Sequence, residues 1–215
     1  MGADWKNGSR GSRLPTNFQI ETRDHVHILH ITSSDGTNRL TQAFILSLHG
    51  ALSNLRQTQK PIIVTGNENY FSVGADLQEI AALTAPAAYE FSKIGQRLMT
   101  AISQFPAPVY AAISGFCMGG GLDLALACHR RIAFPNAIFG HRGAALGLMT
   151  GWGGTQRLPR LIGKALALQA FSAAEKIDAM EASRIGLIDG VAHDPVSEAI
   201  FRIQNTSLRP SPLLL

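Results

Sequence analysis

The sequence has few charged residues, two cysteines and no long apolar run, and each scarcity excludes a class of protein. Asp, Glu, Lys and Arg make up 16% of the 215 residues against 46% hydrophobic residues, which is typical of a compact globular protein. Cys117 and Cys128 lack metal-ligand spacing and favour a reducing compartment over a disulfide framework. Because no run of about 18 apolar residues and no apolar centre of a secretory signal is present, we expect a cytoplasmic protein that does not enter a membrane.

The net charge of +4 is modest and comes from 19 basic against 15 acidic residues. Such an excess can attract a polyanion, for example the phosphate-rich handle of a cofactor. Nucleic acid is the competing polyanion, but the basic residues are spread along the chain and no nucleic-acid-binding motif accompanies them. We therefore expect no nucleic-acid partner.

The length of the chain favours one buried core. Residues 1–17 are rich in Gly, Ser, Arg and Asn and predict a disordered tail or a cloning remnant. Residues 18–162 are predicted to form the core. Residues 163–215 are predicted to form a C-terminal helical segment, possibly truncated, because Ser211–Leu215 offers no capped helix.

Strand-like and helix-like patterns alternate along the core. Thr41 can cap a helix in which Phe44, Leu48 and Leu52 fall on one face. The apolar run at residues 61–66 suits an inner strand covered on both faces. Strands are predicted at residues 25–31, 61–66, 109–113 and 131–134, and helices at residues 41–55, 91–105, 122–127, 165–171 and 179–185. This alternation predicts an α/β fold with mainly parallel strands.

The first loop of interest is Phe71-Ser-Val-Gly-Ala-Asp76, which follows a predicted strand. Gly74 allows a backbone turn that presents the N–H of Ala75 as a hydrogen-bond donor. The alternative is an ordinary turn in which Asp76 caps the next helix.

The second loop is Gly115-Phe-Cys-Met-Gly-Gly-Gly121, between an apolar strand and a helix. Glycines 119–121 leave no side chain in front of the helix N-terminus, where unpaired N–H groups favour negative charge. The alternative is tight packing of the helix on a sheet, and the absence of a following Gly-Lys-Ser/Thr excludes a Walker phosphate loop. Two such loops together supply the two donors that an enolate oxygen requires.

Four segments, in this order, resemble the enoyl-CoA hydratase/isomerase, or crotonase, family. They are Phe71-Ser-Val-Gly-Ala-Asp-Leu77, Pro108-Val-Tyr-Ala-Ala-Ile-Ser-Gly-Phe-Cys-Met-Gly-Gly-Gly-Leu-Asp-Leu-Ala125, Gly153-Gly-Thr-Gln-Arg-Leu-Pro-Arg160 and Glu181-Ala-Ser-Arg-Ile-Gly-Leu-Ile188. The resemblance covers residues from about 20 to 193.

The resemblance implies a crotonase-like ββα superhelix, a coenzyme A thioester as substrate without a prosthetic group or metal, and a homotrimer or a dimer of trimers. It implies that the N–H groups of Ala75 and Gly120 bind the thioester oxygen. It also implies that Ala75, Asp76, Leu77 and Gln78 line the acyl-CoA channel, and it places Gly120 and Gly143 at the substrate. A role in fatty acid metabolism is expected.

The chain departs from the family pattern at the two glutamates that hydratases use. Asp123 stands at one position, with a carboxylate about 1.5 Å shorter in reach, and Gly143 stands at the other. Losing one of two carboxylates weakens syn hydration on geometric grounds, so proton transfer by Asp123 in an isomerisation is the favoured chemistry. The alternatives are a non-catalytic acyl-CoA-binding protein and a thioester hydrolase or decarboxylase, and Asp123 can also be a negative charge in a first helical turn.

The sequence leaves the roles of several other residues near these motifs undecided. His141 and Arg142 can replace the missing glutamate or be solvated loop residues. Trp152 can line the acyl pocket or pack in the core, and Cys117 suits a small buried side chain better than a nucleophile. His129 stands where the family commonly has Asp, and the sequence assigns no mechanistic role to this histidine.

Overall fold

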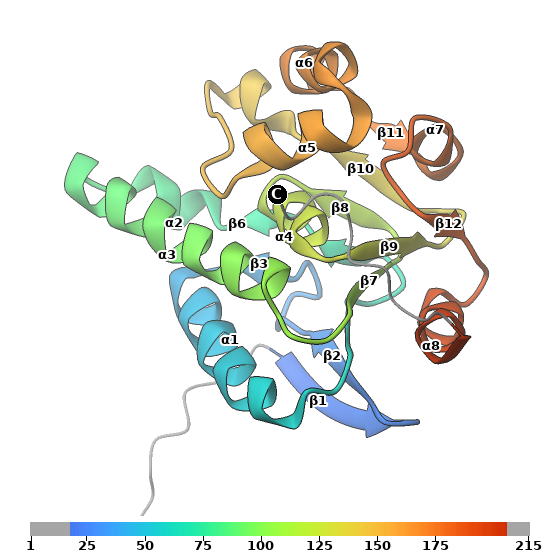
Figure 1. Cartoon of the computed structure of the whole chain (residues 1–215). Coiled ribbons are helices and arrows are strands. Elements are labelled where there is room, and N and C mark those ends of the chain that lie inside the picture. Colours follow the sequence, from blue (N-terminus) through green and yellow to red (C-terminus); the bar gives the residue numbers. More distant parts are fainter. Residues whose placement is uncertain (1–17, 206–215) are drawn as a thin grey trace, which may run out of the picture.

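A six-stranded sheet forms the centre of the fold in the computed structural model, which describes residues 18–205 (Figure 1). The predictions for residues 1–17 and for residues 211–215 lie outside the described residues. All neighbouring strands of the sheet are parallel except β1 and β2. In spatial order the strands are β1 (Phe18–Arg23), β2 (Val26–Ile31), β4 (Ile62–Thr65), β7 (Val109–Ile113), β9 (Arg130–Ala133) and β12 (Gly190–Val191). The predicted α/β class is therefore confirmed.

Helices cover both faces of this sheet. In β4, Ile62 and Val64 lie in the larger core, whereas Ile63 lies in a smaller core on the opposite face. The larger core includes α1 (Gln42–Leu55), α3 (Ala85–Ser103) and α4 (Gly120–Ala127), and α8 (Pro195–Asn205) contributes Ala199 and Ile200 to the smaller one. Burial on both sides removes the polar alternation of a strand, which explains the nearly continuous apolar run of β4.

Two smaller sheets hold the glycine loops. One has the order β11 (Ile177–Asp178), β10 (Ile138–Gly140), β8 (Phe116–Met118) and β5 (Tyr70–Ser72), and the other pairs β3 (Arg39–Leu40) with β6 (Gly74–Ala75). Strands β5 and β8 are parallel, and each leads directly into one of the two loops. The smaller sheets therefore bring the two loops side by side.

Helix α1 begins where the sequence predicts, whereas α3 begins at Ala85, before the predicted start at residue 91. The Oγ1 atom of Thr41 accepts a hydrogen bond from the N–H of Phe44 at 3.1 Å and caps α1. Helix α3 ends at Ser103, so Phe105 lies beyond the helix although it is buried. The remaining helices are α2 (Leu77–Ala81), α5 (Gly154–Ile162), α6 (Lys164–Ala173) and α7 (Ala179–Arg184), with short helical turns η1 (Arg56–Thr58) and η2 (Arg142–Leu146). Within residues 18–205, no helix combines the length and the apolar character that crossing a bilayer needs.

Strand β1 and helices α5 and α8 add to the predicted pattern. Strands β1 and β2 form a hairpin whose turn is Asp24-His25, with φ of 52° and 67°, so the second strand begins at Val26 and not at His25. Helix α5 begins at Gly154 behind a pair of glycines, which hides its start in the sequence. Residues after 163 form strands β11 and β12 as well as helices.

An ion-pair cluster centred on the buried Arg131, called here the Arg131 cluster, joins β9 to the turn before β12. The guanidinium of Arg131 donates to the carboxylate of Asp189 at 3.1 Å and to the carbonyl oxygens of Leu187 and Cys128, each at 2.9 Å. Arg130 donates to the other oxygen of Asp189 at 2.9 Å. Burial lowers the pKa of Arg131, and the charge of Asp189 opposes this effect. Each nitrogen of this guanidinium therefore has a partner inside the fold.

His129 has a structural role. Its Nδ1 accepts a hydrogen bond from the N–H of Val109 at 2.8 Å, and its Nε2 lies 3.2 Å from the carbonyl oxygen of Ser103. A neutral ring with the proton on Nε2 satisfies both contacts. His129 therefore ties the end of α3 to the start of β7, which accounts for a histidine at this position.

Candidate active site

The first loop is held by a buried serine. The hydroxyl of Ser72 donates to the carbonyl oxygen of Asn38 at 2.7 Å and accepts from the N–H of Gly74 at 3.0 Å. Gly74 has φ of +92°, which a residue with a side chain rarely adopts. The predicted turn at Gly74 is confirmed, and Ala75 follows it at the end of β6.

Asp76 acts as the N-cap of α2. Its Oδ1 accepts hydrogen bonds from the N–H groups of Gln78 at 2.8 Å and Glu79 at 3.2 Å. The capping interpretation of Asp76 is therefore confirmed.

The second loop ends in the N-terminus of α4, which starts at Gly120, earlier than predicted. An ideal Cβ on Gly121 would lie 2.6 Å from the carbonyl oxygen of Ser72, and one on Gly120 would lie 2.4 Å from the indole of Trp152. These contacts leave no room for side chains, so the tight-packing interpretation of the glycines is also correct. Because Gly120 is the first helical residue, its N–H lies before the intrahelical hydrogen bonds.

The two loops bring the amides of Ala75 and Gly120 close together. An ideal Cβ on Gly74 would lie 2.7 Å from the nitrogen of Gly120, and one on Gly120 would lie 3.3 Å from the nitrogen of Ala75. The backbones of the two loops are thus in close contact at the N-terminal end of α4, where the helix dipole is positive.

A cavity of about 550 Å³ opens at this point, and its lining is largely apolar. It contains Ala75 and Gly120, and Asp123 is one of its few charged residues. The apolar side chains around it come from α2, α3, β8, η2 and the segment after η2, and they include Leu77, Ile80, Phe91, Phe116, Leu146, Leu148, Met149 and Trp152. Such a surface suits an apolar group bound beside a polar centre.

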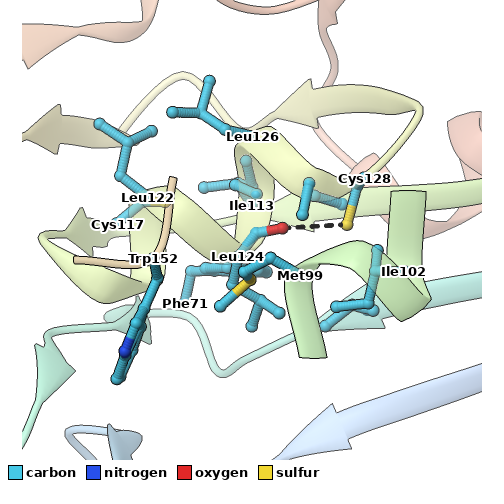
Figure 2. Close-up of a cluster of buried hydrophobic side chains, with 14 of the residues drawn as sticks. Phe71, Met99, Ile102, Ile113, Cys117, Leu122, Leu124, Leu126, Cys128 and Trp152 are labelled. Carbon is cyan, nitrogen blue, oxygen red and sulfur yellow. Dashed lines mark hydrogen bonds between the residues drawn. The ribbon is translucent and has the colours of Figure 1, made fainter. Parts of the chain in front are cut away.

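Trp152 forms the inner wall of the cavity. Its indole packs against the ring of Phe91 with centroids 5.3 Å apart and lies between Gly95 of α3 and Gly120 of α4. Trp152 belongs to the same buried core as Leu122, Leu124 and Leu126 of α4, and Figure 2 shows Leu122 and Leu126 pointing away from its indole. Trp152 is therefore both a core residue and a cavity residue, and its contact with an acyl group stays a prediction.

Asp123 lies on the first turn of α4 and is 1% exposed. The hydroxyl of Thr150 donates a short hydrogen bond to its Oδ2. Its Oδ1 lies 3.3 Å from Nε2 of His141, which is also buried. Asp123, His141 and Thr150 are called here the Asp123 cluster.

Gly143 lines the same cavity without contributing a side chain. An ideal Cβ at this position would lie 2.6 Å from the carbonyl oxygen of Leu148. The N–H of Leu148 also donates to the carbonyl oxygen of Gly143 at 2.8 Å, which closes the loop on itself. A carboxylate at residue 143 would therefore need a different loop.

Comparison with known proteins decides the family. The enoyl-CoA hydratase/isomerase family model matches residues 21–208. A curated crotonyl-CoA hydratase from Syntrophomonas wolfei is 38% identical over 178 residues, which are 81% of this chain and 68% of the relative. This chain belongs to the enoyl-CoA hydratase/isomerase family.

Solved structures agree with this assignment. An enoyl-CoA hydratase from Bacillus anthracis matches with a TM-score of 0.83 at 33% identity, over 88% of this chain and 76% of that one. Another from Thermoplasma volcanium matches with a TM-score of 0.85 at 27% identity, over 91% of this chain and 79% of that one. The predicted crotonase-like ββα superhelix is therefore confirmed.

Some, but not all, of the site residues predicted for this family member line the cavity. Asp123, Ala75, Leu77, Gly120 and Gly143 line it together. The side chain of Asp76 is engaged in capping α2, and Gln78 is exposed, so their roles in binding stay predictions.

The other candidates of this crotonase fold are now placed. Arg142 is exposed, whereas His141 is buried and not a solvated loop residue. Burial raises the pKa of the Cys117 thiol well above its usual value, which agrees with a small buried side chain and not a nucleophile. Within residues 18–205, no group of three or more His, Cys, Asp or Glu side chains could hold a metal ion.

The sequence offers weak signals for two further members of the site. Thr150 and Gly154 lie in or beside the Gly-rich segment that carries the family resemblance, but nothing local assigns them a partner. Their contacts with Asp123 cross 27 residues or more of sequence, so only the fold reveals them.

Proposed function

We propose that this protein processes an acyl-CoA thioester by stabilising its enolate between the N–H groups of Ala75 and Gly120, with Asp123 as the proton-transfer group. One observation carries the proposal: Ala75, Gly120 and Asp123 line the same largely apolar cavity, and the backbones of the two loops are in close contact there. Membership of a family whose hydratases act on coenzyme A thioesters supports the choice of substrate.

The chemistry follows from the charge that develops on the thioester oxygen. Asp123 would remove a proton from a carbon next to or conjugated with the thioester, so that a C–H bond breaks and an O–H bond forms on the carboxylate. The electron pair moves into the enolate, whose oxygen accepts from both amides at the positive end of α4. Return of the same proton to another carbon of the acyl group shifts the double bond.

Isomerisation suits this site better than hydration. Hydration needs a second group to orient a water molecule, and Gly143 offers no side chain for it. The carbonyl oxygen of Leu148 would lie 2.6 Å from a Cβ at residue 143, so a side chain there requires the loop to shift. A proton shuttle through one carboxylate requires only Asp123.

The apolar walls favour an apolar acyl group. Leu146 and Met149 are exposed at 58% and 64%, yet both line the cavity, so a bound acyl chain would cover them. A homotrimer or a dimer of trimers, a cytoplasmic location and a role in fatty acid metabolism stay predictions from the sequence.

The test is a substrate panel with one matched variant. Trans-2-enoyl-CoA, 3-enoyl-CoA and malonyl-type thioesters of short and long chain are incubated with the wild type and with Asp123→Asn, and the products are identified by mass spectrometry. We expect 3-enoyl-CoA to be converted to 2-enoyl-CoA faster than 2-enoyl-CoA is hydrated, and Asp123→Asn to lose this activity.

The second candidate is a non-catalytic acyl-CoA-binding protein, which the single carboxylate at the cavity favours. Binding of a non-reactive acyl-CoA, measured by calorimetry, separates it from the enzyme. Binding without turnover of any thioester would overturn the enzymatic proposal and leave the binding function. Release of free coenzyme A would instead indicate hydrolysis on the same fold.

A further inference from the structure

Two buried polar atoms face each other in the Asp123 cluster without a regular hydrogen bond. Oδ1 of Asp123 and Nε2 of His141 lie 3.3 Å apart, and neither has a hydrogen-bond partner among residues 18–205. Leaving one such atom unpaired costs about 1–3 kcal/mol, and more when it is charged. A proton on Nε2 and a small side-chain rotation would satisfy both atoms at once.

The surroundings hold the imidazole in this place. Its ring packs against Phe171 of α6, with centroids 5.1 Å apart. An ideal Cβ on Gly154 would lie 2.2 Å from Oδ1 of Asp123 and 3.1 Å from Nε2 of His141. The missing side chain of Gly154 therefore leaves the space in which the carboxylate and the imidazole meet.

Asp123 also interacts electrostatically with Arg157 of α5. Burial lowers the pKa of Arg157, and the charge of Asp123 opposes this effect. The guanidinium of Arg157 is held by the carbonyl oxygen of Trp152 at 3.1 Å. Arg157 thus acts on Asp123 through space, while Thr150 and His141 lie next to the carboxylate itself.

We propose that His141 is a positioning residue for Asp123, with Nε2–H donating to Oδ1 while the Thr150 hydroxyl donates to Oδ2. This inference rests on the proposed function of Asp123 and adds to it a means of orienting the carboxylate. Donors on both oxygens fix rotation of the carboxylate about the Cβ–Cγ bond. Asp123 is then held toward the substrate without a second glutamate at residue 143.

His141 acts through Asp123 and not on the substrate. The ring is 5% exposed, and its Nε2 faces the carboxylate. Loss of this contact would leave binding of the acyl-CoA intact but allow the carboxylate to rotate, and small misplacements of a reacting group cost up to about 100-fold in rate. The expected signature is a fall in kcat without a matching rise in KM.

The test compares His141→Phe with His141→Gln. Phe keeps a ring against Phe171 but has no donor, whereas the side-chain amide of Gln can donate to Asp123. We expect His141→Phe to lower kcat for 3-enoyl-CoA about tenfold or more with KM within about twofold, and His141→Gln to recover part of the loss. An unchanged kcat in a folded His141→Phe variant would overturn the proposal. If this variant does not fold, Thr150→Val removes the other donor, and full activity in it would count equally against the proposal.

A measurement on the wild type separates this inference from the proposed function. Long-range ¹⁵N NMR of the histidine rings reports which nitrogen of His141 carries the proton. A proton on Nε2 that becomes more exchangeable in Asp123→Leu supports the pairing even if no thioester is turned over. A proton on Nδ1 alone overturns the pairing even if the enzyme is active.

Discussion

Two buried charged clusters lie at opposite ends of the segment from α4 to β9, and they differ in how their polar atoms are paired. In the Arg131 cluster, the guanidinium and the Asp189 carboxylate have partners at hydrogen-bond distance. In the Asp123 cluster, one carboxylate oxygen and one imidazole nitrogen have no hydrogen-bond partner within residues 18–205. The first cluster lies between elements of the core, and the second lies at the cavity.

This difference in pairing indicates that the Arg131 cluster stabilises the fold, whereas the Asp123 cluster serves the proposed reaction. A fully paired buried ion pair resists the loss of either partner, because the remaining charge would be buried alone. A carboxylate has about four lone-pair sites, so Asp123 keeps hydrogen-bonding capacity for a reacting proton beside the donors of Thr150 and His141. The same substitution, Asp to Asn, should therefore mainly lower stability in the Arg131 cluster and mainly lower activity in the Asp123 cluster.

The largest effect on stability is expected from Asp189→Asn. The amide presents a donor where Arg130 and Arg131 also donate, so the free energy of unfolding should fall by about 3–5 kcal/mol. Urea denaturation followed by circular dichroism measures it. Asp123→Asn is the matched control and should change the unfolding free energy by only about 1 kcal/mol. Equal losses of unfolding free energy in both variants would show that the two clusters contribute equally to stability.

The largest effect on activity among backbone changes is expected from Gly120→Pro. Any Cβ at this position meets Trp152, so Gly120→Ala serves as the control that introduces the same contact but keeps the N–H. Removal of the donor should lower kcat by about 100- to 1,000-fold relative to Gly120→Ala. Steady-state kinetics with the preferred thioester provide the comparison, and equal rates for the two variants would exclude this N–H as a donor to the enolate.

A smaller effect is expected from Gly154→Ala, which directs a methyl group at the contact between Asp123 and His141. Overpacking should lower the unfolding free energy by about 1–3 kcal/mol, and displacement of the carboxylate should lower kcat about tenfold or more. Gly50→Ala is the control because nothing lies within 4 Å of its Cβ position on α1, and it should stabilise the fold by up to about 1 kcal/mol.

The smallest effect is a pH dependence that arises outside both clusters, at His129. Burial lowers the pKa of His129 below its usual value of 6.5, so the unfolded chain binds more protons than the native state as the pH falls below that value. The stabilising contribution of the neutral ring is complete above about pH 6.5 and is lost as the pH falls through the folded-state pKa. Denaturation midpoints at a series of pH values should fall more steeply in the wild type than in His129→Gln.

Local signals predicted much of the fold. Thr41 and the stripe at Phe44 and Leu48 define α1 without reference to the rest of the chain, and the apolar run of β7 identifies a buried strand. Helix α8 was beyond such reasoning because Ala199 and Ile200 pack against strands that are distant in the sequence. Its burial depends on the assembled sheet.

In the candidate site too, some features could be predicted from the sequence and others only from the folded structure. Gly74 was identified from the sequence by the backbone turn that a glycine allows, and Gly120 by the run of three glycines at the start of a helix. The contact of Asp123 with His141 was not, because it depends on the loop after β10 returning to the first turn of α4. The replacement at residue 143 was visible in the sequence, but the position of Leu148 that explains it was not.

The packing of Trp152 on Gly120 gives the protein an optical reporter. The chain has two tryptophans, Trp5 and Trp152, and Trp152 lines the cavity. In a Trp5→Phe variant, intrinsic fluorescence would come from this indole alone. A ligand that enters the cavity would displace water beside the ring and shift its emission, so occupancy can be followed in real time without a label.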